Sequence, residues 1–271
     1  MPENREGQVK TVLDFSRAKR ERQPIVMIAA YDALLARIVA QTAADAILVG
    51  DSVAMVAHGF PSTIHATVEM MVAHVAAVRR GAPEIFVVAD MPFLTARRGK
   101  VAAADAAGAL MTAGANAVKL EGVAGHEDVV EHLGQSGIPV MGHLGLTPQS
   151  VHQFGGYRIQ GRSTGDAERV RAEARRLEEL GAFSLVLECV PAALAAEITE
   201  ERAIPTIGIG AGAGTAGQVL VCSDLLGLDA RFQPRFARRY LEGHELVSDA
   251  INRFARDVRA AEFPAKAEVL A

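Results

Sequence analysis

The stretch AILVGDS, residues 46–52, combines two features that decide the fold: a short apolar run and polar residues directly after it. A continuous apolar run, without alternating polar positions, is typical of a parallel strand that is buried on both faces. Seven further runs of similar character follow or precede it: IVMIAAY (25–31), EIFVVAD (84–90), NAVKLEG (116–122), PVMGHLG (139–145), FSLVLEC (183–189), PTIGIGAG (205–212) and QVLVCSD (218–224). The sequence therefore predicts eight parallel strands.

The segments between these runs carry the signals of helices. Asp32 precedes residues 33–44 and is placed to cap a helix there, and the stretch 67–81 ends in two arginines and a glycine, as helix C-termini often do. Eight strands that alternate with helices, without a low-complexity linker, predict an α/β fold with a single closed (β/α)8 TIM barrel across residues 1–271. An open, doubly wound sheet is the alternative.

Four parts of the chain depart from this alternation. Residues 1–22 are expected to form an N-terminal capping helix below the barrel, and residues from about 231 to 271 a C-terminal helical extension. Within the extension, RFQPRFARRY (231–240) is expected to be a helix that is solvated or contacts another subunit. The seventh and eighth strands have a short connection. The fifth and sixth are joined by LTPQSVHQFGGYRIQGRSTGD (146–166), which has too much glycine and polarity for one continuous helix and is a candidate lid.

The composition excludes several classes of protein. Half of the 271 residues are hydrophobic and 22% are charged, which supports a large core and excludes a disordered chain. The 28 Lys and Arg against 32 Asp and Glu give a net charge of −4, which argues against nucleic acid or a membrane surface as a partner. No stretch resembles a signal peptide or a membrane span, and Cys189 and Cys222 form no CxxC pair. We therefore expect a cytoplasmic protein without disulfides or a zinc site.

Polar side chains follow or end several of the apolar runs. In a barrel these strand ends meet at one mouth, where active sites are built, so residues far apart in sequence would face a common cavity. Lys119 and Glu121 are two residues apart and share one face of their strand. The other residues of this kind are Asp51, Asp90, His143 and Glu188.

Each of these residues also has a structural interpretation. Asp51 and Asp90 are placed where helix N-caps are common, Lys119 with Glu121 would make an ion pair inside the barrel, and a lone histidine is often a core residue. Glu188 is the hardest to explain in this way. It lies inside an apolar strand, where an unpartnered carboxylate would cost several kcal/mol.

Taken together, three carboxylates from successive strand ends predict a hard oxygen site for a divalent cation such as Mg²⁺. A cation with few protein ligands leaves positions for a substrate, and a 2-oxo acid would chelate it through its carboxylate and carbonyl oxygens. Coordination of the carbonyl lowers the energy of the enolate that forms when a neighbouring C–H is deprotonated. Glu188 is the candidate base for this step.

The glycines between the seventh and eighth predicted strands match the letters of a nucleotide-binding motif but not its structural context. Gly212, Gly214 and Gly217 fit GxGxxG, but no acidic residue follows about 20 positions later, and the match is not in an opening βαβ unit. In a barrel, such glycines instead let the backbone approach an anionic ligand closely.

Several motifs, in this order, carry a family resemblance: AAYD (29–32), LVGDS (48–52), VVADMPF (87–93), AVKLEG (117–122), GHLGLTPQS (142–150), FGGYRIQGR (154–162), LVLECVP (185–191) and IPTIGIGAG (204–212). The chain resembles the ketopantoate hydroxymethyltransferase family. The resemblance implies a (β/α)8 barrel that moves a one-carbon unit from 5,10-methylenetetrahydrofolate to 3-methyl-2-oxobutanoate. The products would be 2-dehydropantoate and tetrahydrofolate, in pantothenate biosynthesis.

The resemblance also implies roles for individual residues. Asp51 and Asp90 would bind Mg²⁺, with Glu121 nearby through water. The same two aspartates, together with Ser52, Lys119 and His143, would contact the oxo acid, and Tyr31 would line the pocket. Glu188 would be the proton acceptor. Members of the family assemble as decamers, so the resemblance implies a homo-oligomer.

Two other functions remain open on the sequence alone. A Mg²⁺-dependent C–C lyase of the isocitrate lyase and phosphoenolpyruvate mutase group would use a similar barrel, although the chain has no Lys-Cys-Gly-His run. A non-catalytic paralogue that binds a 2-oxo acid would fit Ala216, which stands where the family has Asp, and the divergent tail from Glu262 to Ala271.

Overall fold

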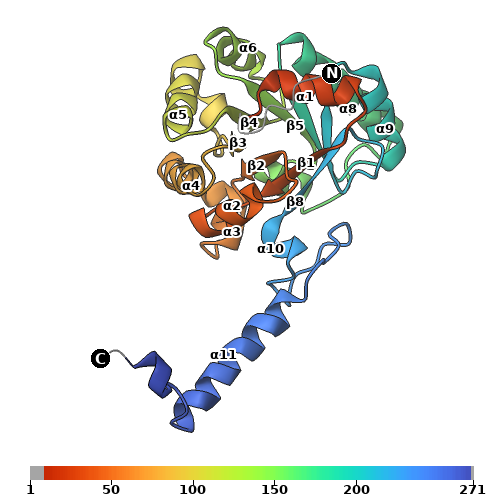
Figure 1. The fold of residues 1–271 in the computed structure, drawn as a ribbon. Helices are drawn as coiled ribbons and strands as arrows, with labels where there is room; N and C mark the ends of the chain where they lie inside the picture. The colour runs from red at the N-terminus through yellow and green to blue at the C-terminus, as the bar shows by residue number, and fades with distance from the viewer. Residues whose placement is uncertain (1–8, 270–271) are drawn as a thin grey trace. The chain divides into compact units, whose positions relative to one another are not determined.

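The computed structural model describes residues 9–269, and its main feature is a closed barrel of eight parallel strands in sequence order (Figure 1). This confirms the predicted fold class. The strands are β1 (Ile25–Ala29), β2 (Ala46–Val49), β3 (Phe86–Asp90), β4 (Ala117–Glu121), β5 (Val140–Gly145), β6 (Ser184–Glu188), β7 (Thr206–Ile209) and β8 (Gly217–Val221).

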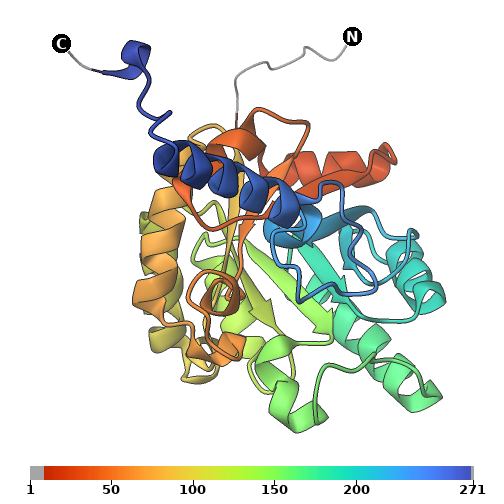
Figure 2. The same cartoon turned by 90° about the horizontal axis from the view of Figure 1, so that it is seen from below.

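Helices surround the strands, as Figures 1 and 2 show from two directions. Asp32 caps α2 as the sequence predicts, since its carboxylate accepts hydrogen bonds from the backbone N–H groups of Leu34 and Leu35. The helices of the barrel are α1 (Val12–Arg20), α2 (Ala33–Ala40), α3 (Val53–Val56), α4 (Val68–Gly81), α5 (Lys100–Thr112), α6 (Glu127–Gln135), α7 (Val151–Phe154), α8 (Thr164–Glu179) and α9 (Ala192–Glu201), with the 3₁₀ turns η1 (Thr63–His65), η2 (Thr95–Arg97) and η3 (Pro148–Ser150).

The expected N-terminal capping helix is α1. Its Phe15 is buried, and the ring lies 5.0 Å from that of Phe86 and 5.5 Å from that of Phe183. Phe86 begins β3 and Phe183 directly precedes β6, so α1 packs at the N-terminal ends of the strands. The part of this prediction that concerns residues 1–8 lies outside the described residues.

Both irregular connections predicted from the sequence are present. No helix lies between β7 and β8, and the β5–α8 connection contains only η3 and α7 before it becomes irregular. Gly145 makes the exit from β5 possible, because its φ is 92° and a Cβ there would lie 2.2 Å from the backbone carbonyl oxygen of Glu188. The backbones at the ends of β5 and β6 therefore approach more closely than a side chain would allow.

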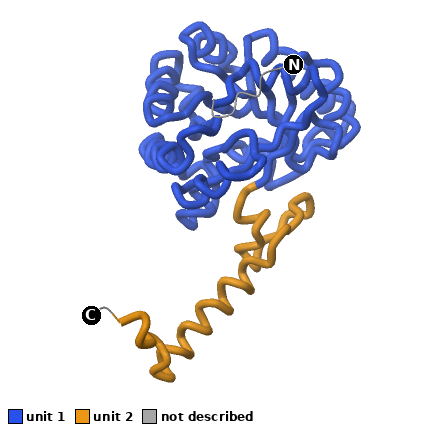
Figure 3. Tube along the Cα trace, viewed as in Figure 1, with its two compact units in different colours: residues 1–220 blue, residues 221–271 orange. Residues whose placement is uncertain are grey.

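The chain divides into two compact units, residues 1–220 and 221–271 (Figure 3). The second unit contains α10 (Cys222–Leu225), α11 (Gly243–Arg259) and η4 (Lys266–Glu268). Helix α11 is amphipathic, and its apolar side chains are exposed: Leu246, Val247, Ile251, Phe254 and Val258. That both units belong to one domain stays a prediction.

One prediction about this unit was wrong: residues 231–240 are not helical. Pro234 lacks an N–H and disfavours a helical conformation at the residue before it. The loop is held by other bonds, since the Arg239 guanidinium donates to the Asp229 carbonyl at 3.0 Å and the Tyr240 N–H donates to the Leu225 carbonyl at 2.8 Å. Across residues 9–269, no helix is long and apolar enough to span a membrane.

Candidate active site

Two aspartates and a lysine meet at the C-terminal ends of β2, β3 and β4, the end of the barrel that we call the mouth. Asp51 follows β2, Asp90 ends β3, and Lys119 pairs with Asp90 in the strand register. The Asp51 N–H donates to Asp90 Oδ2 at 3.0 Å, and Lys119 Nζ forms an ion pair with Asp90 Oδ1 at 2.9 Å. All three residues are buried.

A second group continues this line of contacts around the mouth to β6. Lys119 Nζ lies 3.2 Å from His143 Nδ1, and His143 Nε2 lies 3.1 Å from Glu188 Oε2. Glu121 Oε1 lies 3.6 Å from His143 Nδ1. The ring nitrogen Nε2 carries a hydrogen both in the protonated ring and in the neutral tautomer that accepts from Lys119, and it lies 3.1 Å from Glu188 Oε2 without the alignment of a hydrogen bond.

Exposure separates Glu188 from the other carboxylates. Its side chain is 17% exposed, against 5% for Asp90 and 6% for Glu121. Glu188 therefore has both a fixed neighbour in His143 and an open side toward the mouth. A general base needs this combination, because it has to reach the proton that it removes.

Ser52 and Tyr31 extend the site toward β1 and α3. The Tyr31 hydroxyl and Ser52 Oγ are hydrogen-bonded at 2.8 Å, and Tyr31 is buried. Ser52 directly follows Asp51 in sequence. All eight residues singled out from the sequence thus lie on the strand ends or in the residues next to them, on β1 to β6.

The charges at the mouth shift the protonation equilibria of its members. Burial, together with the carboxylates of Asp90 and Glu121, raises the pKa of Asp51 well above its ordinary value. Burial acts to lower the pKa of Lys119, but Asp90, Asp51 and Glu121 outweigh it and raise that pKa. Lys119 is therefore a permanent cation among these carboxylates.

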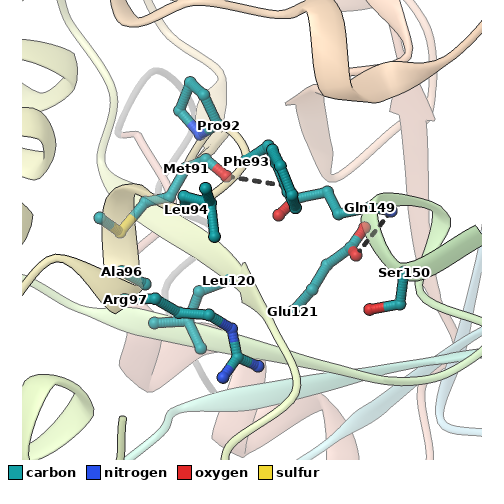
Figure 4. Close-up of a pocket in the computed structure, with 10 residues that line it drawn as sticks. All are labelled: Met91, Pro92, Phe93, Leu94, Ala96, Arg97, Leu120, Glu121, Gln149 and Ser150. Atoms are coloured by element: carbon teal, nitrogen blue, oxygen red, sulfur yellow. Dashed lines mark hydrogen bonds between the residues drawn. The ribbon is translucent and has the colours of Figure 1, made fainter. Parts of the chain in front are cut away.

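The structure adds Gln149, which the sequence did not single out. Its side-chain Nε2 donates to Asp51 Oδ2 at 2.8 Å and to the Met91 carbonyl at 3.0 Å, and its backbone N–H donates to Glu121 Oε2 at 3.0 Å. Figure 4 shows the last two of these bonds beside a cavity of about 30 Å³, which has room for bound water. Gln149 belongs to the motif GHLGLTPQS (142–150), but the motif alone does not show which carboxylates a neutral amide in η3 would reach.

Tyr157, in the β5–α8 connection, was also missed. Tyr157 is 56% exposed; partial burial, and then the carboxylates of Glu188, Asp51 and Glu121, raise the pKa of its hydroxyl, which lies 3.8 Å from Met55 Sδ. Tyr157 also lines a second cavity of about 350 Å³ between residues 61–65 and 151–157. The sequence had placed Tyr157 in the expected lid and in the motif FGGYRIQGR (154–162), but neither gave it a role.

The donor set fits a hard divalent cation with few protein ligands. The Asp90 carboxylate is bonded to the Asp51 backbone, the two carboxylates repel each other, and Glu121 Oε1 is buried without a hydrogen bond to any described residue. No group of three His, Cys, Asp or Glu side chains between residues 9 and 269 is arranged to hold a metal directly. Asp51, Asp90 and Glu121 are therefore the carboxylates at the mouth that could contribute to such a site.

A parallel barrel that carries carboxylates, a lysine and a histidine at the C-terminal ends of its strands belongs to the class of barrel enzymes that act on small molecules at this end. Comparison with known proteins gives the family. The sequence model of ketopantoate hydroxymethyltransferase matches residues 9–266, and the chain belongs to this family of transferases.

Individual relatives agree with this assignment. The 3-methyl-2-oxobutanoate hydroxymethyltransferase of Bdellovibrio bacteriovorus is 50% identical over 96% of this chain and 99% of its own length. Among solved structures, phosphonopyruvate hydrolase in complex with oxalate and Mg²⁺ is similar with a TM-score of 0.63 at 11% identity, covering 97% of this chain and 92% of the other. A 2,3-dimethylmalate lyase has a TM-score of 0.58 at 16% identity, covering 96% and 91%. These two structures show the shared fold alone.

Proposed function

We propose that this enzyme transfers a hydroxymethyl group from 5,10-methylenetetrahydrofolate to 3-methyl-2-oxobutanoate, giving 2-dehydropantoate and tetrahydrofolate in pantothenate biosynthesis. The observation that carries the proposal is the position of Glu188, which faces His143 at 3.1 Å and opens toward the mouth that holds Lys119 and the aspartates. Family membership supports the same reaction.

Asp51 and Asp90 would hold Mg²⁺, and Glu121 would act through water. When bound, the cation would polarise the carbonyl oxygen of the 2-oxo acid and so stabilise negative charge that develops there. The buried Oε1 of Glu121, which has no hydrogen bond to a described residue, and the repulsion between Asp51 and Asp90 support this assignment, because a cation would relieve both. The same two aspartates, Ser52 and Tyr31 would form the wall that contacts the oxo acid.

Glu188 would remove the C3 proton of 3-methyl-2-oxobutanoate. Lys119 and His143 lie on the side where the substrate oxygen would gain charge, so they would orient and stabilise it. The C3 carbon would then form a bond to the one-carbon unit, whose bonds to the two folate nitrogens break. Water supplies the hydroxyl group, and the two nitrogens take up the proton from C3 and the remaining proton of water. His143 would hold the Glu188 carboxyl group in place as its protonation changes.

The cavity of about 350 Å³ beside Tyr157 supports a second substrate of moderate size. Ligand sites commonly have volumes of about 300–1,000 Å³ and are mostly apolar. Ile64, Val151 and Tyr157 give this cavity an apolar lining, and the charges of the mouth carboxylates reach the Tyr157 hydroxyl, since they raise its pKa. Part of the folate co-substrate would occupy it.

The exposed apolar face of α11 supports self-association. Val247, Ile251, Phe254 and Val258 recur at intervals of three and four residues and form one stripe on the helix. Such a stripe is stable when another surface covers it, and we propose a second copy of the chain in a homo-oligomer. The decamer and the cytoplasmic location stay predictions.

Product analysis tests the proposed reaction. The protein is mixed with Mg²⁺, 3-methyl-2-oxobutanoate and methylenetetrahydrofolate, and the products are identified by mass spectrometry. We expect 2-dehydropantoate only when all components are present. Release of glyoxylate or pyruvate from isocitrate-like acids would favour the lyase instead, and tight binding of the oxo acid without any product would favour the non-catalytic paralogue.

A further inference from the structure

The β5–α8 connection crosses the mouth as a segment that is fixed at both ends on β6. We call residues 146–161 the strap. At its start, the Leu146 N–H donates to the Glu188 carbonyl at 2.8 Å, and near its end the Gln160 N–H donates to the Cys189 carbonyl at 3.0 Å. Both anchors are therefore next to the candidate base, on one side of the mouth.

Gln149 connects the strap to the other side. Its three hydrogen bonds reach Asp51 after β2, the Met91 carbonyl after β3 and Glu121 at the end of β4. Both side-chain amide hydrogens have an acceptor, so the orientation of the amide group is defined. Further along the strap, between residues 151 and 159, the Tyr157 hydroxyl also contacts the barrel. It lies 3.8 Å from Met55 Sδ, which is a weaker contact than the bonds of Gln149.

The bonds of Gln149 leave one oxygen on each carboxylate. Asp51 uses Oδ2 for the amide and Glu121 uses Oε2 for the backbone N–H, while Glu121 Oε1 has no hydrogen bond to a described residue. An amide is neutral, so it orients a carboxylate without cancelling the negative charge that attracts a cation. Hydrogen bonds to ligating carboxylates affect metal affinity by about 10–100-fold in other proteins.

We propose that Gln149 is a positioning residue that couples the strap to the cation site. It orients the Asp51 and Glu121 carboxylates toward a divalent cation, and by the same bonds it holds the strap over the mouth. Because linkage is reciprocal, the bound cation stabilises the strap to the extent that the strap stabilises the cation. This coupling rests on the proposed function, because the cation site is part of that proposal.

Two variants with matched chemistry test the coupling. Gln149→Leu keeps most of the side-chain volume but has no donor for Asp51 or Met91. Gln153→Leu is the control, because Gln153 lies on the same strap in α7 but is exposed. Mn²⁺ affinity is measured from the free-ion electron paramagnetic resonance signal, and strap exposure is measured by hydrogen–deuterium exchange of peptides within residues 146–161, with and without Mn²⁺.

We expect Gln149→Leu to raise the Mn²⁺ dissociation constant by about 10-fold or more, and Gln153→Leu to leave it within about 2-fold. Without metal, the strap should exchange faster in Gln149→Leu than in wild type. Mn²⁺ should slow strap exchange in wild type and in Gln153→Leu, and much less in Gln149→Leu. A purely structural role for Gln149 would change the melting temperature without changing the response to Mn²⁺.

Wild-type Mn²⁺ affinity in Gln149→Leu, with equal slowing of the strap, would overturn the coupling. If the wild-type protein binds no Mn²⁺, the cation site of the proposed function is contradicted. The exchange rates of the strap in wild type and Gln149→Leu without metal then still show whether Gln149 anchors the strap. If Gln149→Leu does not fold, the test is the hydrogen exchange of the strap in the wild-type protein. An exchange rate that stays the same when Mn²⁺ binds would contradict the proposal.

Discussion

Charged side chains are usually exposed and apolar ones buried, and the mouth of the barrel and helix α11 depart from this rule in opposite ways. At the mouth, Asp51, Asp90 and Lys119 are ionisable and buried. On α11, Ile251 and Phe254 are apolar and exposed, at 61% and 53%. Each arrangement is unfavourable in an isolated chain, and under the proposed function each would be relieved by binding: a cation and an anionic substrate at the mouth, and an apolar surface on α11. The comparison separates a site for chemistry from a site for assembly.

The largest effect is expected from Asp51→Asn, which removes a charge from the mouth. Product formation should fall by about 10³-fold, because loss of a cation ligand removes several kcal/mol of charge stabilisation. Steady-state kinetics with 3-methyl-2-oxobutanoate and Mg²⁺ measure this. The same variant should be more stable without metal by about 1–2 kcal/mol, since burial disfavours the Asp51 carboxylate and Asn still accepts from Gln149.

The stability arm uses thermal unfolding of metal-free protein. A higher melting temperature together with lost activity would show that the Asp51 carboxylate destabilises the folded protein but is needed for ligand binding. A lower melting temperature would mean that the buried charges stabilise the barrel themselves, and the contrast with α11 would not hold.

The double variant Ile251→Asp with Phe254→Asp should change product formation less than Asp51→Asn does, but it should change the oligomeric state more. Two charges on the apolar stripe should dissociate the proposed homo-oligomer, and light scattering after size-exclusion chromatography should report a lower mass. Asn252→Asp adds a charge at an exposed polar position of α11 and serves as the control. An unchanged mass in the double variant would show that α11 is not the surface of association.

The smallest effect concerns Cys189, which directly follows the candidate base. Burial, and then the charge of Glu188, raise the pKa of its thiol to about 12. Because this pKa lies far above pH 8, the thiolate is scarce there, and iodoacetamide should label Cys189 about 10³-fold more slowly in the native protein than in the unfolded one. Peptide mass spectrometry measures both rates. Rapid native labelling would mean that the region around Glu188 is more open than described.

Much of the fold could be predicted because each strand of the barrel is a local signal. A run such as AILVGDS is buried on both faces, so its apolar residues and the Asp51 that follows depend little on distant parts of the chain. Gln149 could not be predicted, since its role comes from the path of the strap across the mouth. Residues 231–240 were predicted to be helical, but Pro234 and the contacts of this loop with Leu225 and Asp229 decide its conformation.

Exchange of the C3 hydrogen of 3-methyl-2-oxobutanoate in deuterated water tests the central claim most directly, because it isolates proton removal from the folate step. Proton nuclear magnetic resonance follows the exchange with Mg²⁺ in wild type, in Glu188→Gln and in the exposed control Glu200→Gln. We expect rapid Mg²⁺-dependent exchange in wild type and in the control, and exchange reduced by at least about 10²-fold in Glu188→Gln. Exchange at the wild-type rate in Glu188→Gln would contradict the assignment of Glu188 as the base.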